Sequence, residues 1–60
     1  MDYEYGILFG MEEYEPMGTR YTMQDAMAEC EGASGWRFVR GRWVADTDDP
    51  NEFWYVREVD

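Results

Sequence analysis

A single short segment, residues 21–30, carries the only clear helical pattern in the sequence and so limits the folds that are open to the chain. Its apolar residues recur at i, i+3, i+4 and i+7, the spacing of one helix face; they are Met23, Ala26, Met27 and Cys30. Thr22 is a natural N-cap, with Asp25 three residues later. A helix of about two and a half turns is not stable alone in water. It is therefore expected to lie on a sheet formed by the flanking segments.

Residues 2–11 have the period-two alternation of a strand with one buried face. The face expected to be buried is rich in aromatic and aliphatic side chains, which favour strands; it consists of Tyr3, Tyr5, Ile7, Phe9 and Met11. The opposite face, expected to be exposed, consists of Asp2, Glu4, Gly6, Leu8 and Gly10. Its glycines indicate a bulge or the close approach of another backbone segment.

The segment that follows, residues 12–20, is acidic and contains Pro16 and Gly18. Both are turn residues that end strands. The segment is therefore expected to be an irregular connection, with at most a short extra strand at residues 19–21.

Two more strands are expected after the helix. Residues 36–45 interleave apolar and Arg side chains, but the alternation breaks at Gly41. The break fits either a β-bulge in one long strand or a two-residue hairpin turn at Arg40 and Gly41. The bulge is the preferred interpretation, because Arg-Gly is a poor turn pair compared with Asn-Gly. An acidic turn at residues 46–52 leads into the last strand, residues 53–59.

These segments predict a single α+β domain over residues 1–60, with the order β-α-β-β. The sheet is expected to be antiparallel and three-stranded, or four-stranded if residues 19–21 add a strand, with the one α-helix packed on one face. The expected core is Tyr5, Ile7, Phe9, Met27, Cys30 and Trp54 or Tyr55. A chain of this size has a free energy of unfolding of only about 3–5 kcal/mol.

The charge of the chain restricts its function most. Fourteen Asp and Glu face five Arg, which gives a formal net charge of −9. Such a surface repels nucleic acid and attracts basic protein clefts. The sequence has no His, the commonest general base and metal ligand, and its one Cys faces the expected core. We therefore expect a protein that is not an enzyme and needs no cofactor or metal. No apolar run approaches the ~18 residues that span a membrane, so a cytoplasmic location is expected.

The acidic turn that contains Asp46, Asp48 and Asp49 resembles the start of a calcium-binding loop. Such a loop needs Gly at its sixth position and Glu at its twelfth. This chain has Asn51 and Arg57 there, so a solvated turn is the better interpretation.

The Arg-rich stretch at residues 36–43 makes the best case for direct nucleic-acid binding. Aromatic side chains on a sheet can stack on bases while Arg binds phosphates. Fourteen carboxylates in so small a body oppose such binding, and direct contact with nucleic acid is not expected.

The carboxylates themselves are the remaining candidate for an active surface. They recur in groups along the chain, and folding alone does not require so much uncompensated charge. The alternative is that they serve solubility only. The candidate partner-binding residues are Glu12, Glu13, Tyr14, Glu15, Asp25, Glu29, Glu31, Asp46, Asp48, Asp49 and Glu52. An aromatic side chain, Tyr14 or Trp43, is expected to anchor the contact.

In size, charge and layout the whole chain resembles the small acidic inhibitors that phages encode, anti-CRISPR proteins in particular. Several of those place carboxylates where the phosphates of a nucleic acid would lie on the target. The resemblance implies a non-enzymatic inhibitor in the cytoplasm of a bacterial host. Its partner would be a protein with a basic nucleic-acid-binding cleft, for example a CRISPR effector complex. The alternative is a structural or accessory subunit of a phage particle, which would contact its partner through the aromatic residues of the sheet.

Overall fold

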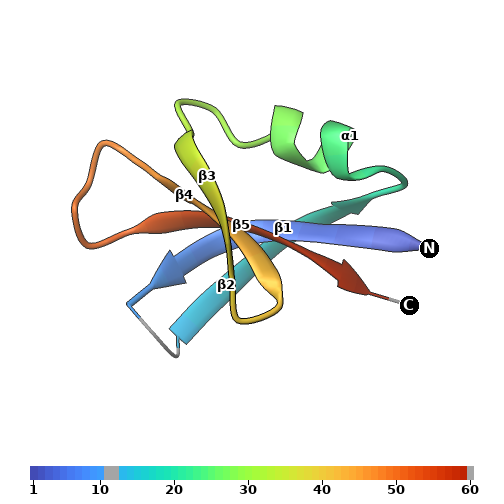
Figure 1. Ribbon diagram of the computed structural model, residues 1–60, viewed down its shortest axis with the longest axis horizontal. Coiled ribbons are helices and arrows are strands. Elements are labelled where there is room, and N and C mark those ends of the chain that lie inside the picture. Colours follow the sequence, from blue (N-terminus) through green and yellow to red (C-terminus); the bar gives the residue numbers. More distant parts are fainter. Residues whose placement is uncertain (11–12, 60) are drawn as a thin grey trace.

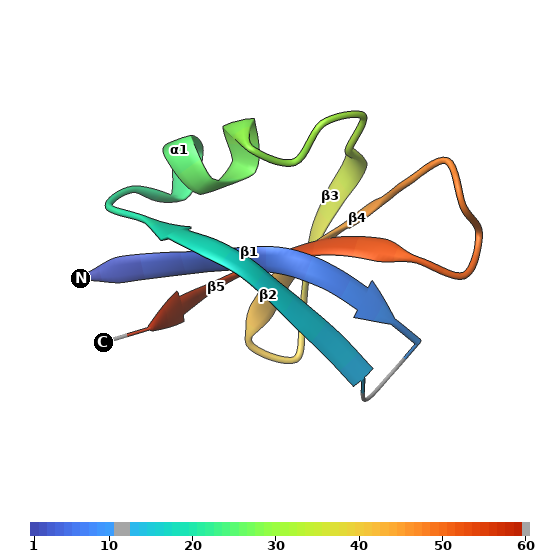
Figure 2. The same ribbon diagram turned by 180° about the vertical axis from the view of Figure 1, so that it is seen from behind.

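The computed structural model describes residues 1–10 and 13–59, and over these residues the chain forms one antiparallel sheet and a short helix (Figure 1). The elements in chain order are β1 (Asp2–Phe9), β2 (Glu13–Arg20), α1 (Met23–Ala28), β3 (Ser34–Val39), β4 (Arg42–Asp46) and β5 (Phe53–Val59). The strand order is β2-β1-β5-β4-β3, so β5 is central and β2 and β3 are the edges. The sheet is strongly twisted, and β3 and β4 cross the direction of β1 in both views (Figures 1 and 2).

The predicted fold class is wrong, because the described chain is a nearly all-β structure whose sheet has five strands. The segment expected to be a connection forms the edge strand β2. Pro16 is tolerated there because one side of an edge strand has no ladder hydrogen bonds to lose. The register also shifts beside it. Tyr5 pairs with Gly18 and Gly6 pairs with Pro16, which leaves Met17 as the extra residue of a bulge.

Residues 36–45 are two strands rather than one, so the bulge interpretation at Gly41 is also wrong. Arg40 and Gly41 form a two-residue turn between β3 and β4, with φ angles of 52° and 84°. Positive values at both positions are what a type I′ hairpin turn requires. A left-handed conformation costs a residue such as Arg40 about 1–2 kcal/mol, and the pairing of β3 with β4 offsets it.

The helix begins as the sequence predicts and ends earlier. Thr22 is the N-cap, and its Oγ1 accepts a hydrogen bond from the Asp25 N–H at 3.1 Å. The helix ends at Ala28, although the apolar pattern continues to Cys30. It packs on the half of the sheet that carries β1, β2 and β5 (Figure 2). Its innermost side chain, Ala26, is fully buried.

The core has two parts, one on each face of the sheet. On the helix face the buried residues are Tyr5, Ala26, Cys30 and Val56. On the opposite face the buried residues are Leu8, Val44 and Tyr55. The prediction that Leu8 faces solvent is wrong, since only 3% of it is exposed.

The expected core is therefore only partly right. Tyr5, Cys30 and Tyr55 are buried, but Ile7, Met27 and Trp54 are half-buried and Phe9 is 44% exposed. The physical reason is the length of α1, whose six residues cover only part of the sheet face.

A hydrogen-bonded group joins β1 to β5 on the face away from the helix. The Tyr55 hydroxyl donates to Glu4 Oε2 at 2.7 Å, and Arg57 Nε donates to the same oxygen at 2.9 Å. Burial by itself would raise the pKa of the Glu4 carboxyl, but the two hydrogen bonds outweigh it and the pKa is lowered. The lowered pKa means that the ionised form of Glu4 stabilises the fold.

This arrangement predicts how stability changes in acid. The carboxylate of Glu4 contributes above its pKa in the unfolded chain, about 4.3, and the contribution disappears as the pH falls through the lower folded value. We expect Glu4→Gln to lower the free energy of unfolding by about 1.5 kcal/mol at pH 7. The difference from the wild type should shrink as the pH falls below about 4. Urea unfolding across pH measures this, with Glu58→Gln as the exposed control. A constant difference at every pH would contradict it.

Candidate functional site

A hollow of about 220 Å³ lies at one end of the sheet, where the β4–β5 turn approaches the segment after the helix. Ile7 and Trp54, which are cross-strand partners on β1 and β5, provide its apolar part. Four carboxylates stand around it; they are Glu31, Asp48, Asp49 and Glu52. Residues far apart in the sequence thus form one acidic rim around an apolar floor.

The edge strand β2 extends this surface. Glu15 is the partner of Ile7 and Glu13 is the partner of Phe9, and directly paired residues project from the same face of a sheet. Both glutamates are exposed. We call the resulting surface the acidic end; it consists of Glu13, Glu15, Glu31, Asp48, Asp49 and Glu52. Figure 1 shows the β4–β5 turn at the side of the molecule away from the two termini.

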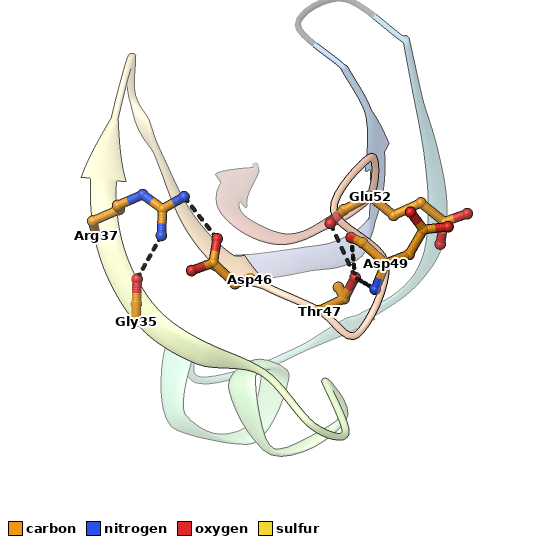
Figure 3. Close-up of polar contacts among 6 residues, drawn as sticks. All are labelled: Gly35, Arg37, Asp46, Thr47, Asp49 and Glu52. Atoms are coloured by element: carbon orange, nitrogen blue, oxygen red, sulfur yellow. Dashed lines mark hydrogen bonds and ion pairs between the residues drawn. The ribbon is translucent and has the colours of Figure 1, made fainter.

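The β4–β5 turn is ordered by its own polar contacts (Figure 3). The Thr47 hydroxyl oxygen lies 2.9 Å from the carbonyl oxygen of Asp49 and 3.0 Å from that of Glu52, and it accepts a hydrogen bond from the Asp49 N–H at 3.0 Å. Asp49 Oδ1 accepts a hydrogen bond from the Asn51 N–H at 2.8 Å. A turn held in this way presents its carboxylates with less conformational entropy to lose on binding.

Trp54 connects β5 to the segment after the helix, two parts of the chain that contribute to the acidic end. Its indole N–H donates to the carbonyl oxygen of Glu31 at 3.0 Å, which fixes the segment after the helix beside β5. Sequence reasoning placed Trp54 among core candidates and missed this role. The alternation of the strand was the available signal. Trp54 and Tyr55 are neighbours on β5, so their side chains point to opposite faces of the sheet and cannot belong to the same part of the core.

Ion pairs neutralise carboxylates elsewhere on the molecule. Arg20 pairs with Glu29 at 3.3 Å. Arg37 pairs with Asp46 at 3.0 Å, and Arg57 pairs with Glu4 at 2.9 Å. The six carboxylates of the acidic end are not among these pairs. These three ion pairs therefore do not offset the negative charge of the acidic end.

The remaining predicted site residues lie elsewhere. Tyr14 projects from the opposite face of β2 and packs edge-on against Tyr55, with ring centroids 5.7 Å apart. Asp25 borders a separate hollow with Arg20. Glu29 and Asp46 are in the ion pairs above, and Glu12 lies outside the described residues, as does Met11. Trp43, the other expected anchor, packs with Phe38 on the β3–β4 hairpin.

Cys30 has the environment of a structural thiol. It is 5% exposed, and its Sγ donates to the Ala26 carbonyl oxygen at 3.5 Å. Burial, with a smaller contribution from the charge of Glu29, raises the pKa of the thiol to about 11. Little thiolate is therefore present near neutral pH. In the described part of the chain no three His, Cys, Asp or Glu side chains are arranged to hold a metal ion.

No helix within residues 1–10 and 13–59 is long and apolar enough to cross a membrane. Comparisons with protein-family models, curated proteins and solved structures gave no match to this chain.

Proposed function

We propose that this protein is a non-enzymatic inhibitor that places its acidic end in a basic, nucleic-acid-binding cleft of a partner protein. The single observation that carries the proposal is the gathering of carboxylates at one end of the sheet. Four of them, from the segment after α1 and the β4–β5 turn, line the hollow at Ile7 and Trp54, and Glu13 and Glu15 of β2 extend the same face. Arg and Lys side chains that hold phosphates also bind carboxylates. A CRISPR effector complex is a partner of the required chemistry.

The apolar floor of the hollow supports contact as well as steering. A cation of the partner would lay its aliphatic stem over Ile7 and Trp54 while its charged group meets Asp48, Asp49 or Glu52. Indole rings also attract cations through their π face. Charge brings the two proteins together quickly, and a buried aromatic contact slows their separation.

Displacement of nucleic acid tests the proposal. A CRISPR effector complex is loaded with fluorescently labelled target DNA, and the anisotropy of the label is followed as this protein is added. We expect the DNA to be displaced, and the apparent affinity of the protein to fall as salt rises from about 50 to 300 mM. An unstructured glutamate peptide of the same net charge is the control, and it should compete far more weakly.

Two results would count against the proposal. One is a failure to displace nucleic acid from any basic-cleft protein tested at about 150 mM salt. The other is binding that does not change with salt, which would favour a contact made by aromatic residues, as in an accessory subunit of a phage particle.

A further inference from the structure

A second hollow, of about 350 Å³, lies on the face of the sheet away from the helix. Its floor is apolar and includes Leu8, Val44 and Phe53. Its rim carries Arg37, Arg40 and Arg42, three of the five cations of the chain. The volume is within the range of about 300–1,000 Å³ that is typical of small-molecule sites. We call it the arginine pocket.

The β3–β4 hairpin brings these arginines together. Arg37 pairs with Val44, and Arg42 pairs with Val39, so the two arginines project from the same face of neighbouring strands. Arg40 lies in the turn that joins the strands. A single long strand, as the sequence suggested, would have separated them along its length.

One guanidinium of the rim is held in place, and another arginine has an unusual backbone conformation. The Arg37 guanidinium is held by the Asp46 carboxylate at 3.0 Å and by the Gly35 carbonyl oxygen at 2.9 Å (Figure 3). Arg40 adopts φ 52°, which an Asn or Gly at this turn position would adopt at lower cost. Non-glycine residues in such conformations concentrate at functional sites.

We propose that the arginine pocket binds a small organic anion. The apolar body of the ligand lies on Leu8, Val44 and Phe53, and its carboxylate or phosphate group meets the arginines of the rim. Guanidinium groups bind both kinds of anion. A small anion fits better than a nucleic acid strand, because a long polyanion is repelled by the net charge of −9. This site is separate from the acidic end and does not depend on the proposed inhibition.

Binding of 8-anilinonaphthalene-1-sulfonate, an aromatic anion with a fluorescent body, tests this directly. The control is N-phenyl-1-naphthylamine, which has the same ring system without the charge. We expect the anion to bind at one site and more tightly than the neutral compound. Amide shifts in two-dimensional NMR spectra should concentrate at Val39, Arg40, Val44 and Phe53. Decanoate and decyl phosphate are then compared as competitors, and the more effective one identifies the preferred head group.

Arginine variants distinguish binding by the pocket from a general effect of net charge. Arg40→Gln together with Arg42→Gln should weaken binding of the anion about tenfold or more, because charge-assisted hydrogen bonds are lost. The control is Arg20→Gln combined with Arg57→Gln, which removes the same number of charges outside the pocket. This control, and Arg20→Gln alone, should change the affinity for the anion much less. NMR dispersion confirms that each variant is folded. Equal binding of the neutral compound, equal effects of both sets of variants, or shifts centred on Trp54 would overturn the proposal. A preference for single-stranded nucleic acid over decanoate would do so too.

Discussion

A Gly6→Ala variant should lose most of its free energy of unfolding and be partly unfolded at room temperature, although it adds only one methyl group. A Cβ atom at Gly6 would collide with the carbonyl oxygen of Glu15 and would lie 2.9 Å from both the Pro16 Cα and the Tyr55 Cε2. Two of these three atoms belong to the backbone of β2, which cannot rotate away. We expect a loss of about 3 kcal/mol, against a total of about 3–5 kcal/mol for a chain this small.

Urea unfolding and the dispersion of the NMR spectrum measure this effect. Gly32→Ala is the matched control, because nothing lies within 4 Å of a Cβ there and only its φ of 74° opposes the change. That variant should lose about 1 kcal/mol and stay folded. A Gly6→Ala protein as stable as the control would show that β2 does not pack closely on β1 at the bulge.

Gly6 also explains how the second face of the sheet is buried without a helix. The close approach of β2 at Pro16 places the Tyr55 ring over the glycine, and the Tyr14 ring covers Tyr55 from the side. Tyr55 is consequently only 1% exposed. The sequence indicated a close approach or a bulge on this face of the strand, and the structure has both at adjacent positions.

Local features of the fold were predictable from the sequence. The Thr22 cap is confirmed, because a cap depends only on residues within one turn. The sheet was also expected to be antiparallel, and every strand pair in the described chain is. The number of strands was not predictable in the same way. Pro16 and Gly41 each end a strand in most contexts, and what they do here depends on whether the strand is an edge or turns back on itself.

The composition of the acidic end depends on contacts that are distant in the sequence. Glu15 and Trp54 lie on the same face only because both pair with Ile7 of β1, which lies between β2 and β5. Glu31 lies beside Trp54 only because the chain after α1 passes next to β5. Charge grouping along the sequence found all six carboxylates, together with neighbours that the fold directs elsewhere. Those neighbours are Tyr14, Asp25, Glu29 and Asp46; Glu12 lies outside the described residues. Glu31 was grouped with the helix, and its carboxylate instead borders the β4–β5 turn.

Two sets of four neutral substitutions are expected to have very different effects on displacement of nucleic acid. The first set replaces Glu15, Glu31, Asp48 and Glu52, all in the acidic end, with the corresponding amides. The second set does the same at Asp2, Asp25, Glu29 and Glu58, which lie outside it. Each set removes four charges and takes the formal net charge from −9 to −5. A difference in competition between the two variants therefore cannot be an effect of net charge.

The first set should weaken competition about thirtyfold. An exposed ion pair contributes about 0.2–1 kcal/mol, so four of them amount to about 2 kcal/mol, and each 1.4 kcal/mol is a factor of about ten. The second set should cost less than about threefold. Glu29 is already paired with Arg20, and Asp2, Asp25 and Glu58 lie toward the other end of β1 and β5, where their charges are screened from the contact at physiological salt. Thermal unfolding checks that both proteins remain folded. If both sets weaken competition equally, the partner responds to diffuse charge. If neither does so while Trp54→Ala abolishes binding, the carboxylates are not the contact surface.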